Sequence, residues 1–267
     1  AGAYFKLDVD PIVDSTPTGY VAAENIAALS ALSVITDGAH SLYVWLEDSA
    51  GNSDPYMRTA LLNAFKLDRA APTLSAPTLQ GPLGEDGLHY RGPVTVTLAA
   101  SDDLSGLSAI HYQIEADPVV TVPIVGAPAS AQHQETLFFE GERRQLTFWA
   151  TDAATNEQTT AQTVALRFDS LAPTAPSGIT VQPATWTSTN SFTVSWTNPV
   201  DYSGIASAYY KRGSAPTAGT DGTKYTLPAF GETSIAGIAL TQQGETPLYL
   251  WLKDQAGNVD HTSAVST

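Results

Sequence analysis

The sequence predicts an all-β protein made of tandem β-sandwiches, and three observations lead to that fold class. One strand-and-turn motif occurs three times, as LYVWLEDSAGN at 42–52, LTFWATDAATN at 146–156 and LYLWLKDQAGN at 248–258. The tryptophans of the three copies lie 104 and 102 residues apart, which is the size of a whole small domain. Apolar and polar residues alternate elsewhere, and 17 prolines and 20 glycines fall mostly between such runs.

The repeated strand has two faces, because side chains alternate along a strand. In the middle copy Leu146, Phe148 and Ala150 form an apolar face, and Trp149 lies on the other. We therefore expect one outward tryptophan in each copy, beside Tyr4, His111 or Tyr209 of a neighbouring strand. The candidate outer-face contact residues are Trp45, Trp149, Trp251, Tyr43 and Tyr249. They either form an aromatic platform for sugar rings or another molecule, or stabilise the sheet by ~0.2 to 1 kcal/mol per cross-strand pair.

Other stretches also have the period of half-buried strands. Residues 94–102 alternate valine and leucine with threonine, and residues 192–199 alternate in the same way. Trp196 shares its face with Phe192 and Val194, which predicts a core position. Residues 20–32 are the one stretch that is compatible with a short helix, and we expect strand there, as at 227–240.

Proline-bearing segments mark the boundaries between copies. Asp68 precedes Pro72 by the same four positions that separate Asp169 from Pro173. Proline stiffens such a segment and removes a ladder donor, so each segment is expected to be a semi-rigid joint. The predicted ranges are 1–70 for the C-terminal part of a first sandwich, 71–172 for a second, and 173–267 for a third whose last strand is cut short.

The first copy lacks the sequence equivalent of its first two strands. We expect the chain to be a window cut from a longer array. The alternative is that another subunit supplies the missing strands by β-augmentation.

The residues of the middle copy resemble a known family. PVTVTLAASDDLSGLSAIHYQI and LTFWATDAATNEQTTAQTVALRFDSLAP look like a bacterial immunoglobulin-like repeat of secreted and cell-surface proteins, over nearly all of 72–173. FTVSWTNPVDYSGIASAYYK is similar to the fibronectin type III pattern. The resemblance implies a spacer, stalk or adhesive module without catalytic residues. Thr155 departs from it, because Gly51 and Gly257 hold that position elsewhere, so the middle turn is not expected to rely on glycine's access to positive φ.

The composition narrows the classes of partner. Twelve basic and 27 acidic residues give a net charge of -15, which disfavours nucleic acid. The chain has no cysteine, so it has no disulfide or thiolate metal site, and this favours a bacterial or archaeal surface over a eukaryotic ectodomain. No apolar run approaches the ~18 to 20 residues of a membrane span. Expected partners are other copies, neighbouring immunoglobulin-like modules or a cell-surface glycan.

Recurring aspartates allow two interpretations. Asp48, Asp152 and Asp254 each precede an asparagine by four residues, Asp68 and Asp169 lie at the joints, and Asp102 and Asp103 form a further acidic pair. In the first interpretation, these side chains bond local main-chain N–H groups and shape turns. In the second, they bind an interdomain Ca²⁺, although no run matches a dense calcium-binding loop. We expect no other cofactor.

No catalytic motif is present in the sequence. The five histidines lie in unrelated contexts, and there is no nucleophile elbow, phosphate-binding loop or dinucleotide fingerprint. The sequence therefore predicts a non-catalytic, extracellular structural segment of a surface stalk, filament or adhesin. The alternative is an accessory spacer or glycan-binding portion of a secreted multimodular enzyme.

Overall fold

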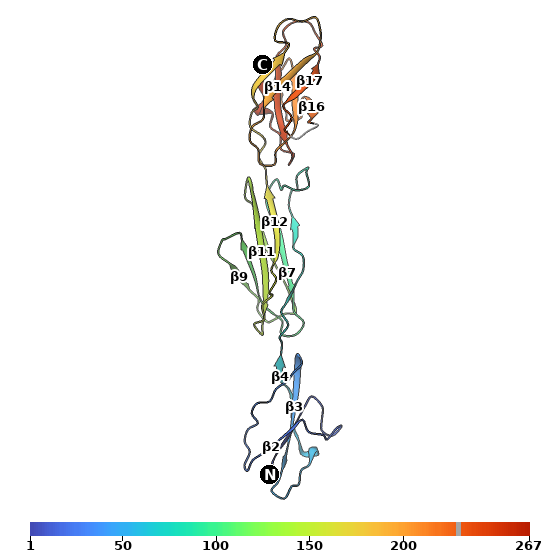
Figure 1. Cartoon of the computed structure of the whole chain (residues 1–267), viewed down its shortest axis with the longest axis vertical. Coiled ribbons are helices and arrows are strands. Elements are labelled where there is room, and N and C mark those ends of the chain that lie inside the picture. The colour runs from blue at the N-terminus through green and yellow to red at the C-terminus, as the bar shows by residue number, and fades with distance from the viewer. Residues whose placement is uncertain (228–230) are drawn as a thin grey trace.

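The structure, a computed structural model, describes residues 1–227 and 231–267. It is built from β-strands, and its only helical segments among these residues are two short 3₁₀ turns, η1 (Pro55–Met57) and η2 (His261–Ser263). The strands form three groups that follow one another along a narrow rod (Figure 1), with the first residues at one end and the last module at the other. No helix in the described part is long and apolar enough to cross a membrane.

The middle group is a two-sheet sandwich. One sheet has the order β10-β7-β5, with β6 also paired to β7, and the other has the order β12-β11-β8-β9. The strands are β5 (Thr73–Leu74), β6 (Thr78–Gln80), β7 (Val94–Ser101), β8 (Leu107–Ile114), β9 (Val120–Pro123), β10 (Ser130–Leu137), β11 (Glu142–Asp152) and β12 (Gln162–Phe168).

The core of this sandwich confirms the predicted alternation. Val94, Val96 and Leu98 of β7 are fully buried. They belong to one apolar cluster with Leu146 and Phe148 of β11, which come from the opposite sheet. Each apolar face is covered by the other, as a β-sandwich requires.

The last group is a second sandwich, with sheets β13-β14-β17 and β16-β15-β18-β19. Its strands are β13 (Ser177–Gln182), β14 (Phe192–Thr197), β15 (Ile205–Arg212), β16 (Thr223–Thr226), β17 (Ser234–Ile238), β18 (Leu248–Asp254) and β19 (Val265–Ser266). Trp196 is 4% exposed inside this core, as predicted. The strand predicted within 227–240 is β17, and residues 228–230 of that stretch lie outside the described residues.

The first group forms a single sheet of order β2-β1-β3-β4. Its strands are β1 (Gly2–Leu7), β2 (Gly19–Ala22), β3 (Gly38–Glu47) and β4 (Thr59–Leu67). Strand β2 occupies the start of the ambiguous stretch 20–32, and the rest of that stretch is neither helix nor strand. Leu46 holds the position that the core-facing Ala150 has in the middle copy, but it is 64% exposed, because no described strand covers that face of the sheet. Its equivalent Ala150, under the second sheet of the middle sandwich, is fully buried.

The turns after the repeated strands share one backbone shape. Gly51 has φ of 85°, Gly257 has φ of 98°, and Thr155 of the middle copy has φ of 72°. The middle turn therefore keeps the left-handed conformation although its residue is β-branched, a combination that is strained.

Candidate functional site

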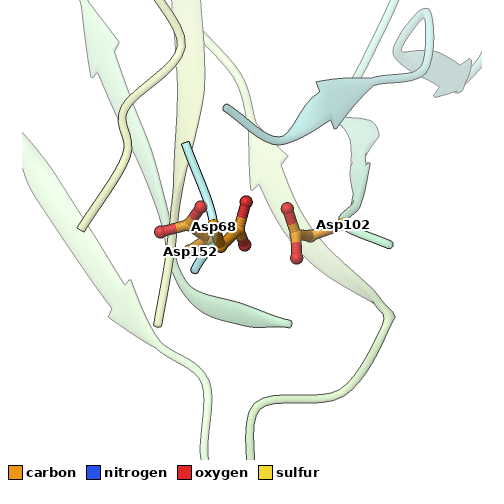
Figure 2. A group of neighbouring side chains, drawn as sticks. All are labelled: Asp68, Asp102 and Asp152. Atoms are coloured by element: carbon orange, nitrogen blue, oxygen red, sulfur yellow. The ribbon is translucent and has the colours of Figure 1, made fainter. Parts of the chain in front are cut away.

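Two acidic clusters lie at the two joints of the rod, and each is built from the same three positions. Asp68, Asp102 and Asp152 form the first cluster, and their carboxylate oxygens lie within 4.8 Å of one another. Figure 2 shows these three side chains turned toward a common space from three separate segments of the chain. The second cluster has the same property and consists of Asp169, Asp201 and Asp254.

The spacing of the clusters follows the sequence repeat. Asp169, Asp201 and Asp254 stand 101, 99 and 102 residues after Asp68, Asp102 and Asp152. In each cluster one aspartate comes from the proline-bearing joint, one from the turn that ends in Ser-Gly, and one from the end of the tryptophan strand. The sequence singled out five of these six aspartates, missed Asp201, and did not predict that they converge.

The strand-end aspartates hold their own turns. The Asp152 carboxylate accepts hydrogen bonds from the N–H of Asn156 and from its side-chain Nδ2, both at 2.7 Å. Asp254 accepts the same pair from Asn258 at 2.7 and 2.8 Å. Asp48 does so from Asn52 in the first module, at 2.8 and 2.9 Å. This confirms the prediction that these aspartates shape turns by local hydrogen bonding.

The same asparagines also hold the joints, which the sequence did not predict. Nδ2 of Asn156 donates to the main-chain oxygen of Asp68 at 3.1 Å. Nδ2 of Asn258 donates to the main-chain oxygen of Asp169 at 3.0 Å. In each turn, one asparagine side-chain amide therefore donates both to the aspartate of its own turn and to the main chain of the preceding linker.

The linker carboxylates complete the joint from the other side. Oδ2 of Asp68 accepts the N–H of Ser105 at 2.9 Å, and Oδ2 of Asp169 accepts the N–H of Ser203 at 3.0 Å. These serines begin the Ser-Gly pairs at 105–106 and 203–204, which occupy equivalent positions of the repeat. The linker is thus bonded to two turns of the module that follows it.

A loop of the middle sandwich reinforces the second joint alone. The N–H of Glu85 donates to the main-chain oxygen of Ala256 at 3.0 Å, and Nε of Arg91 donates to Oδ1 of Asn258 at 2.7 Å. The Glu85 carboxylate also forms an ion pair with Lys253, whose side chain is 9% exposed. In the described residues no hydrogen bond or ion pair links 1–67 directly to 73–168, so the first joint depends on its linker.

The electrostatics of the second cluster are unfavourable without a counter-charge. Asp169 and Asp254 are 2% and 1% exposed. Burial raises the pKa of Asp254 to about 6, and the charges of Asp169 and Asp201 add to this, against the hydrogen bonds from Asn258. Burial, together with the charge of Asp169, also raises the pKa of Asp201. In the first cluster the hydrogen bond with Ser105 lowers the pKa of the half-buried Asp68.

Both clusters have the chemistry that a hard divalent cation prefers. Calcium binds six to eight oxygens from carboxylates, main-chain carbonyls and water. Oδ2 of Asp102 and Oδ2 of Asp201 have no hydrogen-bond donor among the described residues. Each cluster can therefore offer carboxylate oxygens to a cation, with water needed to complete its coordination.

The predicted aromatic residues lie on the outer face of each sheet, as expected. Trp45 stacks on Tyr4, Trp149 on His111 and Trp251 on Tyr209, with ring centroids 5.4 to 5.6 Å apart. These are the neighbours that the sequence predicted. The interpretation as stabilising cross-strand pairs fits this geometry.

Three of the five candidate contact residues are not accessible, which corrects the prediction. Trp45 is 4% exposed, Tyr43 is 9% exposed and Trp251 is fully buried. The loop before β16 covers Trp251, whose Nε1 donates to the main-chain oxygen of Gly219 at 2.7 Å. Trp149 and Tyr249 are half-buried, and their role in binding stays a prediction.

Comparisons with known proteins find likeness in fold only. No family model and no curated protein matches the chain. Among solved structures, a segment of a 1.5-MDa bacterial ice-binding adhesin is 17% identical with a TM-score of 0.38, covering 100% of this chain and 84% of that one. Domains of titin are 13% identical with a TM-score of 0.40, covering 96% and 84%. Two fibronectin type III domains of chicken tenascin are 15% identical with a TM-score of 0.27, covering 74% and 98%. The chain is thus similar to tandem immunoglobulin-like and fibronectin type III domains.

Proposed function

We propose that this chain is a non-catalytic structural segment of an extracellular stalk, filament or adhesin. The observation that carries the proposal is the duplicated joint. In both joints the side-chain amide of an asparagine in the following module donates a hydrogen bond to the main-chain oxygen of the linker aspartate. A linker that only tethered its neighbours would need no such bonds. Joints that are held in one geometry favour a spacer that keeps its ends apart.

The mechanism is geometric. Each sandwich resists deformation because its core is close-packed. Each joint restricts bending because proline stiffens the linker and the Asn–linker hydrogen bond fixes the direction in which the next module begins. The high negative charge keeps such an elongated surface soluble and opposes lateral collapse onto other copies.

Cation-dependent stiffening is a second candidate property, favoured by the carboxylate clusters. Three acidic groups within 4.8 Å repel one another unless a proton or a cation is present. A divalent ion would offset this repulsion and draw the linker toward both turns. The expected signature is a rod that is straighter and melts at a higher temperature in calcium than in chelator.

The alternative function is that of an accessory spacer in a secreted multimodular enzyme, with Trp149 and Tyr249 as glycan contacts. The joint geometry suits a stalk segment and an enzyme spacer equally, so the sequence that flanks this chain discriminates between the two functions. A flanking catalytic domain supports the spacer of an enzyme, and further flanking modules with an anchor support the stalk.

Small-angle X-ray scattering of the Asn258→Ala variant tests the proposed joint. This change removes the bond to Asp169 and the bond from Arg91. Asn52→Ala is the matched control, because Asn52 makes the same bonds inside its turn but, in the part of the chain that the structure describes, none to a linker. We expect Asn258→Ala to shorten the maximum dimension and broaden the ensemble of shapes. Equal scattering from the two variants would contradict the hypothesis that Asn258 holds the second joint in one geometry.

A further inference from the structure

The tryptophan of the middle module is the most exposed of the three equivalent indoles. Trp149 of β11 is half-buried, whereas Trp45 is 4% exposed and Trp251 is fully buried. Its ring stacks on His111 of β8, with the ring centroids 5.4 Å apart. Both rings lie on the outer face of the β12-β11-β8-β9 sheet. On this face, therefore, the repeated tryptophan is accessible to another molecule.

Loop length explains why this face is open. The connection from β8 to β9 has five residues, 115–119. The equivalent connections of the first and third modules, 8–18 and 213–222, have 11 and ten residues. In the third module the longer connection covers Trp251, whose Nε1 donates to the main-chain oxygen of Gly219. The middle module is too short at this point to form such a cover.

Two arginines lie directly opposite each other on the same outer face. Arg143 of β11 pairs with Arg167 of β12, and Arg143 is six positions from Trp149, which is ~20 Å along a strand. Like charges that face each other across two strands destabilise a sheet. The adjacent Arg144 points to the other side and pairs with Glu142. Among the described residues, neither guanidinium of the opposed pair has an ion-pair or hydrogen-bond partner. This pair therefore carries uncompensated positive charge in a chain whose net charge is -15.

The row of side chains between the arginines and the tryptophan is polar. Thr147 pairs with Thr163 at outward positions, and Gln145 stands next to Arg143 on the same side of β11. Glu115, which follows β8, turns its carboxylate to the main-chain N–H of Gln145, at 2.6 Å. The tryptophan is the one large apolar side chain at the described outward positions of β11 and β12. The face therefore lacks the apolar centre that a protein partner usually buries.

We infer that this outer face binds an anionic polysaccharide. The carboxylate or sulfate groups of the sugar chain bind Arg143 and Arg167, and their charge offsets the repulsion between the two guanidiniums. A guanidinium donates two parallel hydrogen bonds to such a group, a strong charge-assisted contact. The sugar rings run along the threonines and pack on Trp149, whose indole offers a flat apolar surface. This inference deepens the glycan contact proposed at Trp149 by naming the charge of the ligand. Its test does not involve the joints, so either proposal can fail without the other.

The probes are two anionic polysaccharides, polygalacturonate and heparin, titrated into the intact chain at low salt in chelator. We expect saturable binding of at least one of them, weaker at higher salt, because salt screens exposed charges. Dextran, which has rings but no charge, should bind about tenfold more weakly or less, and so should polyglutamate, which has carboxylates but no sugar rings. Tryptophan fluorescence should change on binding, and Trp149→Phe should abolish that change.

Arg143→Gln is the decisive variant, and Arg144→Gln is its matched control. Both remove one positive charge at neighbouring positions, but the Arg144 side chain points away from the proposed site and pairs with Glu142. Arg143→Gln should weaken binding about tenfold or more, because it removes a charge-assisted contact. It should melt at or above the wild-type temperature, because it also removes a like-charge pair. Arg144→Gln should bind as the wild type does.

The inference would be overturned if neither anionic polysaccharide bound, or if the two arginine variants bound equally. Polyglutamate binding as tightly as the polysaccharides would reassign the face to an acidic polypeptide, and equal binding of dextran would reassign it to a neutral glycan. A fluorescence change that persists in Trp149→Phe would place the sugar chain elsewhere. Each of these results contradicts an anionic polysaccharide bound between the arginine pair and Trp149.

Discussion

The second acidic cluster allows a quantitative prediction for Asp201→Asn. The pKa of Asp254 is raised from 3.8 to about 6, so its ionised form is less stable in the folded protein than in the unfolded chain by roughly 3 kcal/mol. Burial is the largest cause of this rise, and the charges of Asp169 and Asp201 add to it. Two unit charges ~4.8 Å apart repel by roughly 3 kcal/mol at an effective dielectric constant of about 20. Because the folded pKa lies above the unfolded one, the folded state binds more protons between about pH 4 and pH 6. The stability of the third module should therefore fall as the pH rises through this window.

Asparagine at 201 removes one of the three charges and keeps the local hydrogen bonds. Oδ1 of Asp201 accepts the N–H of Gly204 at 2.9 Å, which an amide oxygen also does. The new amide N–H₂ would stand where Oδ2 has no donor, and it can donate to a neighbouring carboxylate. We expect a gain of about 1–2 kcal/mol at pH 7.5 in chelator, less than the full repulsion because Asp169 and Asp254 still face each other. The fall in stability between pH 4 and pH 6 should become shallower.

Differential scanning calorimetry in chelator at pH 5 and pH 7.5 measures both effects. A gain of 1 kcal/mol corresponds to a melting temperature about 4–8 °C higher for a module of this size. Asp103→Asn is the control, since Asp103 is exposed and lies outside both clusters. An Asp201→Asn transition at or below the wild-type temperature at pH 7.5 would refute the electrostatic reasoning. If the electrostatic reasoning holds, calcium should raise the melting temperature of the wild type more than that of Asp201→Asn.

Four further outcomes are expected. Thr155→Gly should raise the melting temperature of the middle module, because it relieves a β-branched residue at φ 72°, with a gain of about 1 kcal/mol; an unchanged transition would argue against strain. Phe148→Ala should cost about 3–5 kcal/mol in the same module, seen as one early calorimetric transition while the third module melts as before. Gly84→Ala should loosen the second joint, since its Cβ would lie 2.6 Å from the main-chain oxygen of Ala256; scattering identical to wild type would contradict this. Acrylamide should quench Trp149 but not Trp251, a contrast that single-tryptophan variants can measure.

Much of the fold was predictable because the repeat supplies its own alignment. The alternation around Phe148 and Val96 identified the two faces that meet in the core, and three copies of one strand set the module length. The burial of Trp251 was not predictable. It depends on a loop that has no equivalent signal in the repeat and that bonds the indole through Gly219.

The candidate site was predictable in its parts but not as a whole. Strand periodicity placed Asp152 at a strand end and proline placed Asp68 in a joint, but neither gives the distance between them. That distance depends on how one module begins relative to another, which is a tertiary property. The nearly equal spacing of the three aspartates across the two joints, 101, 99 and 102 residues, is the signal from which one shared location could have been found.

The two joints differ, and the difference has a mechanical consequence. A pulling force along the rod passes through both joints in series, so both carry the same load. The second joint has the Glu85–Lys253 and Arg91–Asn258 contacts to share that load, while among the described residues the first has only its linker bonds. Thermal bending and the first yielding under tension should therefore concentrate near Asp68, while the second and third modules keep a common axis.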